Sequence, residues 1–251
     1  MPDPSAHQQP DLVAATIRPF QPSVDGFHFV NSFPGVPLPF RLPRLPGLSK
    51  AIYGLCGGMC FTVLDFQHAG KPLPDLDRAP EPGSRLHRYL FWRQMASFGT
   101  LGVYILRFIY WMFLPEDTAR GTWKRTYDHA QSVFERLARG ERVVLGIEYV
   151  GIRDTLIPWK NHQVLAHGCS EISPDVWDIH VYDPNLPRND SVVIRAMRVT
   201  VGTRRGDSGI EEPIYGLRCL QKSKHSPDTK VRGFFPVAYR PRTPPEDRIS
   251  G

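Results

Sequence analysis

A cysteine within a glycine-rich turn is the residue of this sequence best suited to chemistry. Cys56 lies in the segment YGLCGGMCF (residues 53–61), and the apolar spacing that follows Gly58 predicts a helix. A thiol reacts as a nucleophile only when it is deprotonated, and the free N–H groups and dipole of a helix N-terminus favour the thiolate. The same N–H groups can bind the oxyanion that forms when sulfur attacks a carbonyl. We therefore predict that Cys56 is a nucleophile and that Gly57 lies at the oxyanion.

A histidine and an aspartate far downstream can complete the chemistry of that thiol. His162 begins a predicted strand and Asp183 ends the next one, and strand alternation puts both on matching faces. We expect an antiparallel hairpin in which Gly168 pairs near Trp177, a register that places His162 directly opposite Asp183. A carboxylate there would hold the imidazole in one tautomer and stabilise the imidazolium. Cys56, His162 and Asp183 are therefore the predicted catalytic triad.

Three segments resemble motifs of the papain-like cysteine hydrolase superfamily. The Cys-Gly step at Cys56, followed by a helix, is similar to the nucleophile turn of the bacterial peptidase-C39-like branch. Residues 161–164 (NHQV) resemble the Asn-His-Ala-Val of papain-like enzymes, and residues 182–185 (YDPN) resemble the Tyr-Asp-Pro of the C39-like branch. The resemblance implies an α+β, papain-like fold, in which a helical half carries Cys56 and an antiparallel sheet half carries His162 and Asp183.

The resemblance also implies a reaction and a class of substrate. The thiolate would attack the carbonyl of a peptide, an amide or an acyl thioester, and a thioester with Cys56 would follow. Water as the acceptor would give a peptidase or amidase. An amine or alcohol would give an acyltransferase, as in C39-like proteins that remove acyl groups from carrier proteins. Neither reaction needs a cofactor or a metal ion, and we expect none.

One departure from the superfamily pattern concerns the oxyanion. The superfamily has a glutamine a few residues before the cysteine, but residues 49–53 of this chain are SKAIY. We expect Asn31, in an aromatic segment further upstream, to supply an amide instead, and Asn161 to contact the oxyanion or the substrate. Two alternatives remain: Asn31 belongs to a turn before Pro34, and the chain is a catalytically inactive, papain-like binding module.

The cysteines and histidines also require a zinc site to be considered. Cys56 and Cys60, together with His162, His167 and Cys169, are ligand types that zinc prefers. His162 and His167 are an odd number of residues apart, so a regular strand would direct them to opposite faces. The pattern therefore favours a nucleophile over a metal ligand, and we expect Cys60 to pack between helices.

The apolar pattern predicts helices in the first half of the chain and strands in the second. The expected helices run from residue 58 to a stop at Gly70, and over residues 84–97, 101–114 and 118–139. The expected strands cover residues 143–150, 162–168, 176–183, 191–201, 214–220 and 231–239. This order is typical of an α+β fold with a mostly antiparallel sheet.

Local composition divides the chain into three parts. Residues 1–50 are rich in proline and aromatic residues, which predicts an ordered arm packed on the body. Residues 51–239 form the expected catalytic domain, and residues 240–251 form an expected disordered tail. The apolar run 101–114 is too short to span a bilayer, so we expect a buried helix there. An acyl-binding wall and a membrane-lying surface are the alternatives for that helix.

Charge and cysteine content argue against several classes of function. The formal net charge is +6, but the arginines are scattered, whereas nucleic-acid binding would need a basic stripe. The first residues have neither the basic nor the apolar region of a secretory signal, so the four cysteines are expected to be reduced thiols. We therefore expect a cytoplasmic location. The sequence does not indicate an oligomeric state.

Overall fold

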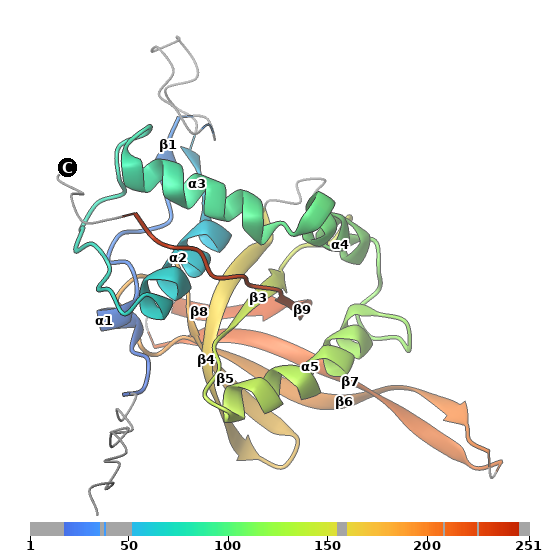
Figure 1. Ribbon diagram of the computed structural model, residues 1–251. Helices are drawn as coiled ribbons and strands as arrows, with labels where there is room; N and C mark the ends of the chain where they lie inside the picture. The colour runs from blue at the N-terminus through green and yellow to red at the C-terminus, as the bar shows by residue number, and fades with distance from the viewer. Residues whose placement is uncertain are drawn as a thin grey trace, which may run out of the picture.

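A large antiparallel sheet organises the computed structural model, which describes residues 18–35, 38, 52–154, 160–207, 209–224 and 226–245. The helices are α1 (Pro22–Asp25), α2 (Cys56–His68), α3 (Arg85–Ser97), α4 (Val103–Met112) and α5 (Thr122–Ala138), with a 3-10 turn at Thr100–Gly102. The strands are β1 (Phe33–Pro34), β2 (Ile52–Tyr53), β3 (Val143–Glu148), β4 (His162–Ser173), β5 (Val176–Tyr182), β6 (Val193–Arg205), β7 (Glu211–Ser223), β8 (Ser226–Val231) and β9 (Gly233–Val237). Among these strands, seven form one antiparallel sheet in the order β8-β7-β6-β5-β4-β3-β9 (Figure 1). The fold is therefore α+β, as predicted.

The sheet is a middle layer, because its two faces belong to different apolar cores. In β3, Val144 packs with buried residues of α2 and α3, whereas its neighbour Leu145 packs with those of α5. Phe235 and Phe234 of β9 are divided in the same way. Successive side chains of a strand point to opposite faces, so α2 and α3 cover one face and α5 covers the other (Figure 1). The layer that contains α2 brings Cys56 to the sheet.

Two glycines at the start of α2 allow this helix to lie very close to its neighbours. A Cβ atom at Gly57 would come within 1.9 Å of Gln163 Oε1 in β4. A Cβ atom at Gly58 would come within 2.2 Å of the Leu90 carbonyl oxygen in α3. Glycine lowers helix propensity, but here it is required for close packing. The approach holds Cys56, the residue before the glycines, against the sheet.

A buried ion pair holds the middle of α2 against α3. Asp65 is fully buried, and one of its carboxylate oxygens lies 2.6 Å from Arg93 Nε. Arg93 also donates a hydrogen bond to the Arg240 carbonyl oxygen, and the Arg242 N–H donates to Asp65 Oδ1 at 2.9 Å. Residues 240–245 are therefore ordered, and the prediction of a disordered tail is wrong for them. A buried charge pair needs these backbone partners, which composition alone does not reveal.

The upstream arm contributes its aromatic side chains to the same core as α2. Four of these side chains are buried there: Phe20, Phe27, Phe29 and Phe33. The remaining parts of the predicted arm, residues 1–17, 36, 37 and 39–50, lie outside the described residues, as do residues 246–251 of the predicted tail.

The apolar run at residues 101–114 forms a shorter and more exposed helix than predicted. Leu101 and Gly102 have positive φ angles of 56° and 70°, so regular α-helix begins only at Val103. The buried residues of α4 are Phe108, Trp111 and Met112, whereas large apolar side chains elsewhere on it are exposed: Val103, Leu106, Ile109 and Tyr110. The prediction of a buried helix is therefore wrong for one side of α4. Within the described residues, no single helix meets the length and hydropathy criteria for crossing a membrane, although α3 and α4 together, bent by 54°, do.

The β4–β5 hairpin has a register different from the predicted one. β4 continues to Ser173, and the chain reverses at Asp175, which has a φ angle of 70°. Gly168 therefore pairs with His180 and does not pair with Trp177. The predicted strand ended too early because the second half of the observed β4 is mostly polar and partly or fully exposed. A polar segment of this kind is typical of a turn.

His162 consequently does not lie directly opposite Asp183, and that prediction is wrong. His162 pairs with Ile147 of β3, and the β4–β5 ladder ends with Leu165 opposite Tyr182. His162 and Asp183 nevertheless lie at the same end of neighbouring strands, within diagonal reach of their side chains. The predicted matching of faces is confirmed by the core that these residues share: Val164, Ala166, Ile179 and Val181.

The last predicted strand, residues 231–239, is divided between two edges of the sheet. The division lies at Arg232, whose N–H donates to the Glu148 carbonyl oxygen and whose buried guanidinium donates to the Leu114 carbonyl oxygen. β8 extends the sheet beyond β7, whereas β9 pairs with β3 at the opposite edge. The prediction missed β8 because most of its side chains are polar and exposed.

The packing at Gly58 predicts the effect of one methyl group. Gly58→Ala should destabilise the protein by about 1–3 kcal/mol, because α3 must move away from α2 to accommodate the Cβ atom. Urea denaturation measures this loss, with Gly168→Ala as the matched control. A Cβ atom at Gly168 would meet His180 at an ordinary 3.7 Å. Equal midpoints for Gly58→Ala and the unmodified protein would contradict the packing argument.

Candidate active site

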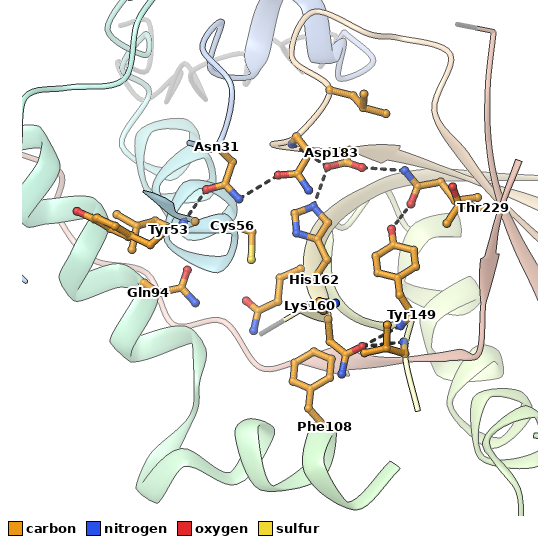
Figure 2. A pocket seen from close by; sticks show the side chains of 18 of the residues that line it. Asn31, Tyr53, Cys56, Gln94, Phe108, Tyr149, Lys160, His162, Asp183 and Thr229 are labelled. Atoms are coloured by element: carbon orange, nitrogen blue, oxygen red, sulfur yellow. Dashed lines mark hydrogen bonds and ion pairs between the residues drawn. The ribbon is translucent and has the colours of Figure 1, made fainter. Parts of the chain in front are cut away.

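The three residues of the predicted triad meet at one end of the sheet. Cys56 is the first residue of α2, His162 is the first residue of β4, and Asp183 follows the last residue of β5. All three line a cavity of about 1240 Å³ between the helical layer and the sheet (Figure 2). The structure thus brings together residues that are more than a hundred positions apart in the sequence.

Cys56 and His162 interact as a charged pair. Burial alone would raise the pKa of the Cys56 thiol, but His162 and the backbone N–H groups of Gln163 and Gly57 outweigh burial and lower this pKa. Burial would also lower the pKa of His162, but Asp183 and Cys56 raise it to about 10. The site therefore favours a thiolate beside an imidazolium.

Asp183 binds the ring nitrogen of His162 that faces away from the sulfur. His162 Nε2 lies 2.7 Å from Asp183 Oδ1, and both side chains are buried. This contact leaves Nδ1 as the ring nitrogen directed toward Cys56 (Figure 2). Burial would raise the pKa of Asp183, but His162 and a hydrogen bond from the Asn185 N–H hold it below its usual value. Asp183 is therefore an anion that orients the imidazolium.

Two further side chains extend this network. Gln221 Nε2 donates to Asp183 Oδ2 at 2.8 Å, and Gln221 Oε1 accepts a hydrogen bond from the Tyr149 hydroxyl. The Tyr149 ring is stacked beside the His162 ring, with centroids 6.4 Å apart. Neither Gln221 nor Tyr149 was predicted from the sequence. Both support the position of the histidine–aspartate pair.

Two side-chain amides reach the cavity beside the nucleophile. Asn31, the predicted donor, accepts the Leu55 N–H at 2.5 Å and donates Nδ2 to Asn185 Oδ1 at 3.1 Å. Gln94 of α3 accepts the Gly58 N–H at 2.9 Å through Oε1, which directs Nε2 toward the cavity (Figure 2). Gln94 was not predicted. Its Nε2 group donates to no other described residue, so both N–H bonds are available to a ligand.

A signal for both glutamines is present in the sequence. Gln94 follows Leu90 by four residues and therefore lies on the buried face of α3. Gln221 follows Cys219 by two residues and lies on the buried face of β7. A polar side chain within an apolar stripe must find hydrogen-bond partners, so such positions point to an internal network.

Asn161 contacts the backbone of the segment that directly follows β3. Its Oδ1 atom accepts the N–H groups of Tyr149 at 2.9 Å and Val150 at 3.2 Å. The adjacent Glu148 is fully buried, and burial raises the pKa of its carboxyl group to about 8. Asn161 lines the cavity, but its oxygen is committed to this backbone contact. Only its Nδ2 group could serve the predicted contact with substrate or oxyanion.

The other cysteines differ from Cys56 in their surroundings. Cys60 is fully buried in the core around α2, but its thiol lies 3.7 Å from the Gln163 carbonyl oxygen of β4, so it packs against the sheet and the predicted position between helices is wrong for its sulfur. Burial raises the pKa of Cys169 to about 11 and raises that of Cys219 further. In the described part of the chain, no group of three or more His, Cys, Asp and Glu side chains could hold a metal ion.

A scan against protein-family models, a search of curated proteins and a search of solved structures each found no significant match to this chain. The chemistry of the site must therefore be argued from its own residues and their geometry.

The charged pair predicts an unusual pH dependence for alkylation of Cys56. Iodoacetamide should label Cys56 with a midpoint below that of an ordinary thiol, because the surroundings lower the pKa of the thiol. In His162→Ala, burial is no longer opposed by the imidazolium, so the labelling midpoint should move to higher pH. Peptide mapping across pH measures both, and Cys169 is the internal control. A midpoint unchanged by His162→Ala would refute the ion pair.

Proposed function

We propose that this protein is a papain-like, cysteine-dependent enzyme that transfers an acyl group through a thioester at Cys56. The observation that carries the proposal is the contact between His162 Nε2 and Asp183 at 2.7 Å, with Nδ1 of the same ring directed to the sulfur. An amide or thioester carbonyl is the expected electrophile, because a thiolate attacks either one without a cofactor.

The first half of the reaction forms the acyl-enzyme. The Cys56 thiolate attacks the carbonyl carbon, a C–S bond forms, and the carbonyl electrons move onto oxygen. When the oxyanion collapses, the bond to the leaving nitrogen or sulfur breaks, and the His162 imidazolium gives that group its proton. Asp183 stays ionised and holds the imidazole throughout. The product is a thioester on Cys56 and a neutral imidazole.

The second half returns the enzyme to its starting state. Neutral His162 takes a proton from the acceptor, whose oxygen or nitrogen attacks the thioester carbonyl. The C–S bond then breaks, and the Cys56 thiolate and the imidazolium are restored together. Water as the acceptor gives hydrolysis, and an alcohol or amine gives acyl transfer.

The amide groups beside Cys56 bear on the alternative of an inactive binding module. That alternative depended on the absence of a glutamine shortly before the cysteine. Gln94 provides a glutamine amide at the cavity from a different element, and Asn31 provides a second amide. This position of Gln94 supports an active site, because its amide N–H could bind the oxyanion in place of the usual upstream residue.

The proposal predicts a covalent intermediate at one cysteine. Incubation with a small acyl thioester should add one acyl group to Cys56, detected by intact mass and peptide mapping. Cys56→Ser and His162→Ala should each lower the rate of this acylation at least about 100-fold, because nucleophile and proton donor act as a unit. Cys169→Ser is the matched control and should acylate normally. Equal acylation of Cys56 and Cys169 would exclude an activated nucleophile.

Gln94 and Asn31 make different predictions for the oxyanion. Gln94→Met preserves the shape of the side chain but removes Nε2, so kcat should fall about 10²–10³-fold. Asn31→Ala should cost less, because both polar atoms of Asn31 already bind protein groups. Steady-state kinetics of the two variants, with circular dichroism to check folding, compares them. A larger fall in kcat for Asn31→Ala would assign the oxyanion donor to Asn31.

A further inference from the structure

The cavity around Cys56 has two chemically different sides. On the side of α3 and α4, its lining consists mostly of large apolar side chains: Phe91, Met95, Phe98, Ile105 and Phe108. On the side of β7 and β8, its lining is mostly polar: Gln221, Lys222, Ser223, Ser226 and Thr229. In Figure 2, Phe108 lies below His162 and Thr229 lies to the right of His162, beyond Tyr149, whereas Cys56 lies to the left of the His162 ring. A carbonyl at the sulfur would therefore have an apolar side and a polar side.

The apolar side is a surface that a ligand can cover. Met95 retains 37% of its exposure, and Phe98 and Ile105 are also partly exposed, although all three line the cavity. Apolar surface left open in this way gains about 0.8 kcal/mol for each methylene group that covers it. The cavity volume of about 1240 Å³ exceeds the roughly 300–1,000 Å³ of ordinary small-molecule sites. The cavity is therefore large enough for a ligand that has both an extended apolar part and a polar part.

The chemistry of this wall distinguishes a hydrocarbon chain from a peptide. A bound peptide needs hydrogen-bond partners along its backbone, because unpaired amides are costly to bury. Gln94 is the only polar side chain that α3 and α4 contribute to the described lining of the cavity. A hydrocarbon chain has no such requirement, and Gln94, whose Oε1 accepts the N–H of Gly58 two residues after Cys56, is placed to serve the carbonyl itself.

We propose that the acyl group taken up by Cys56 is a long hydrocarbon chain, which lies along the wall formed by α3 and α4. This inference rests on the proposed function and names its substrate class. The polar leaving group of the substrate lies toward β7 and β8. In the covalent step, the Cys56 thiolate forms a new C–S bond with the acyl carbon. The original C–S bond breaks, and the leaving thiolate takes its proton from His162.

The test is the dependence of Cys56 acylation on chain length. Acyl thioesters of N-acetylcysteamine with two, eight and twelve carbons are incubated with the full chain, and the rate is followed by intact mass. The rate constant should rise at least about tenfold from two to twelve carbons, because each added methylene group covers apolar wall. A rate independent of chain length, with Cys56 still acylated, would overturn this inference and leave the proposed function standing. No acylation by any thioester would instead overturn the proposed function.

Two adjacent residues of α4 provide matched variants. Ile105 lines the cavity, whereas Leu106 does not line it and is 62% exposed. Ile105→Gln should reduce the ratio of the twelve-carbon to the two-carbon rate at least about threefold, and Ile105→Leu should restore it. Leu106→Gln should leave the ratio unchanged. An equal reduction by both glutamine variants would refute a chain-binding wall at this cavity.

The last two experiments identify the donor of the acyl group and compare a hydrocarbon acyl group with a peptide. The same twelve-carbon acyl group is offered as a thioester of coenzyme A and as a thioester of an acyl carrier protein. Faster acylation from one of them identifies the natural source of the acyl group. A peptide thioester ending in leucine is the competing substrate. If that peptide acylates Cys56 faster than every twelve-carbon donor, the site prefers peptides and the inference is wrong.

Discussion

The absence of side chains at two successive positions of α2 is the constraint on which the rest of the site depends. Without Cβ atoms at Gly57 and Gly58, the start of the helix can touch Gln163 of β4 on one side and α3 on the other. This contact sets the position of the sulfur of Cys56 relative to the first residue of β4, which is His162. A Cβ atom at either position would push the start of the helix away from the sheet or from α3, and the Cys56 thiol would move with it.

The charges of the three buried groups at the site depend on one another. Burial opposes ionisation of Cys56, His162 and Asp183 alike, and each keeps its charge because an oppositely charged neighbour outweighs burial. Gln221 and Tyr149 satisfy the second oxygen of the aspartate and the face of the imidazole. The energetic unit is therefore the whole network, and the Cys56 thiol is one end of it.

Short motifs pointed to residues that meet in the structure, but they predicted the wrong strand register for that meeting. The contact between His162 and Asp183 was expected from a register that is wrong, and it forms because both residues end up at the same edge of the sheet. Local patterns also located α2, α3 and most strands. They did not reveal the exposure of α4 or the partners of Asp65, because both depend on which segments meet in space. For Gln94, the sequence pattern indicates a buried position on its helix, but it does not indicate that the hydrogen-bond partner is the N–H of Gly58.

The link between Asp65 and Arg242 has a consequence for synthesis on the ribosome. The carboxylate of Asp65, in the nucleophile helix, receives one of its hydrogen bonds from a residue made about 180 positions later. β9, which pairs with β3, is likewise among the last described segments to be made. A nascent chain can therefore form α5 and the central hairpins early. The helix that carries Cys56 acquires these partners only after residues 233–242 have been made, so the surroundings of Cys56 are completed later than the central hairpins.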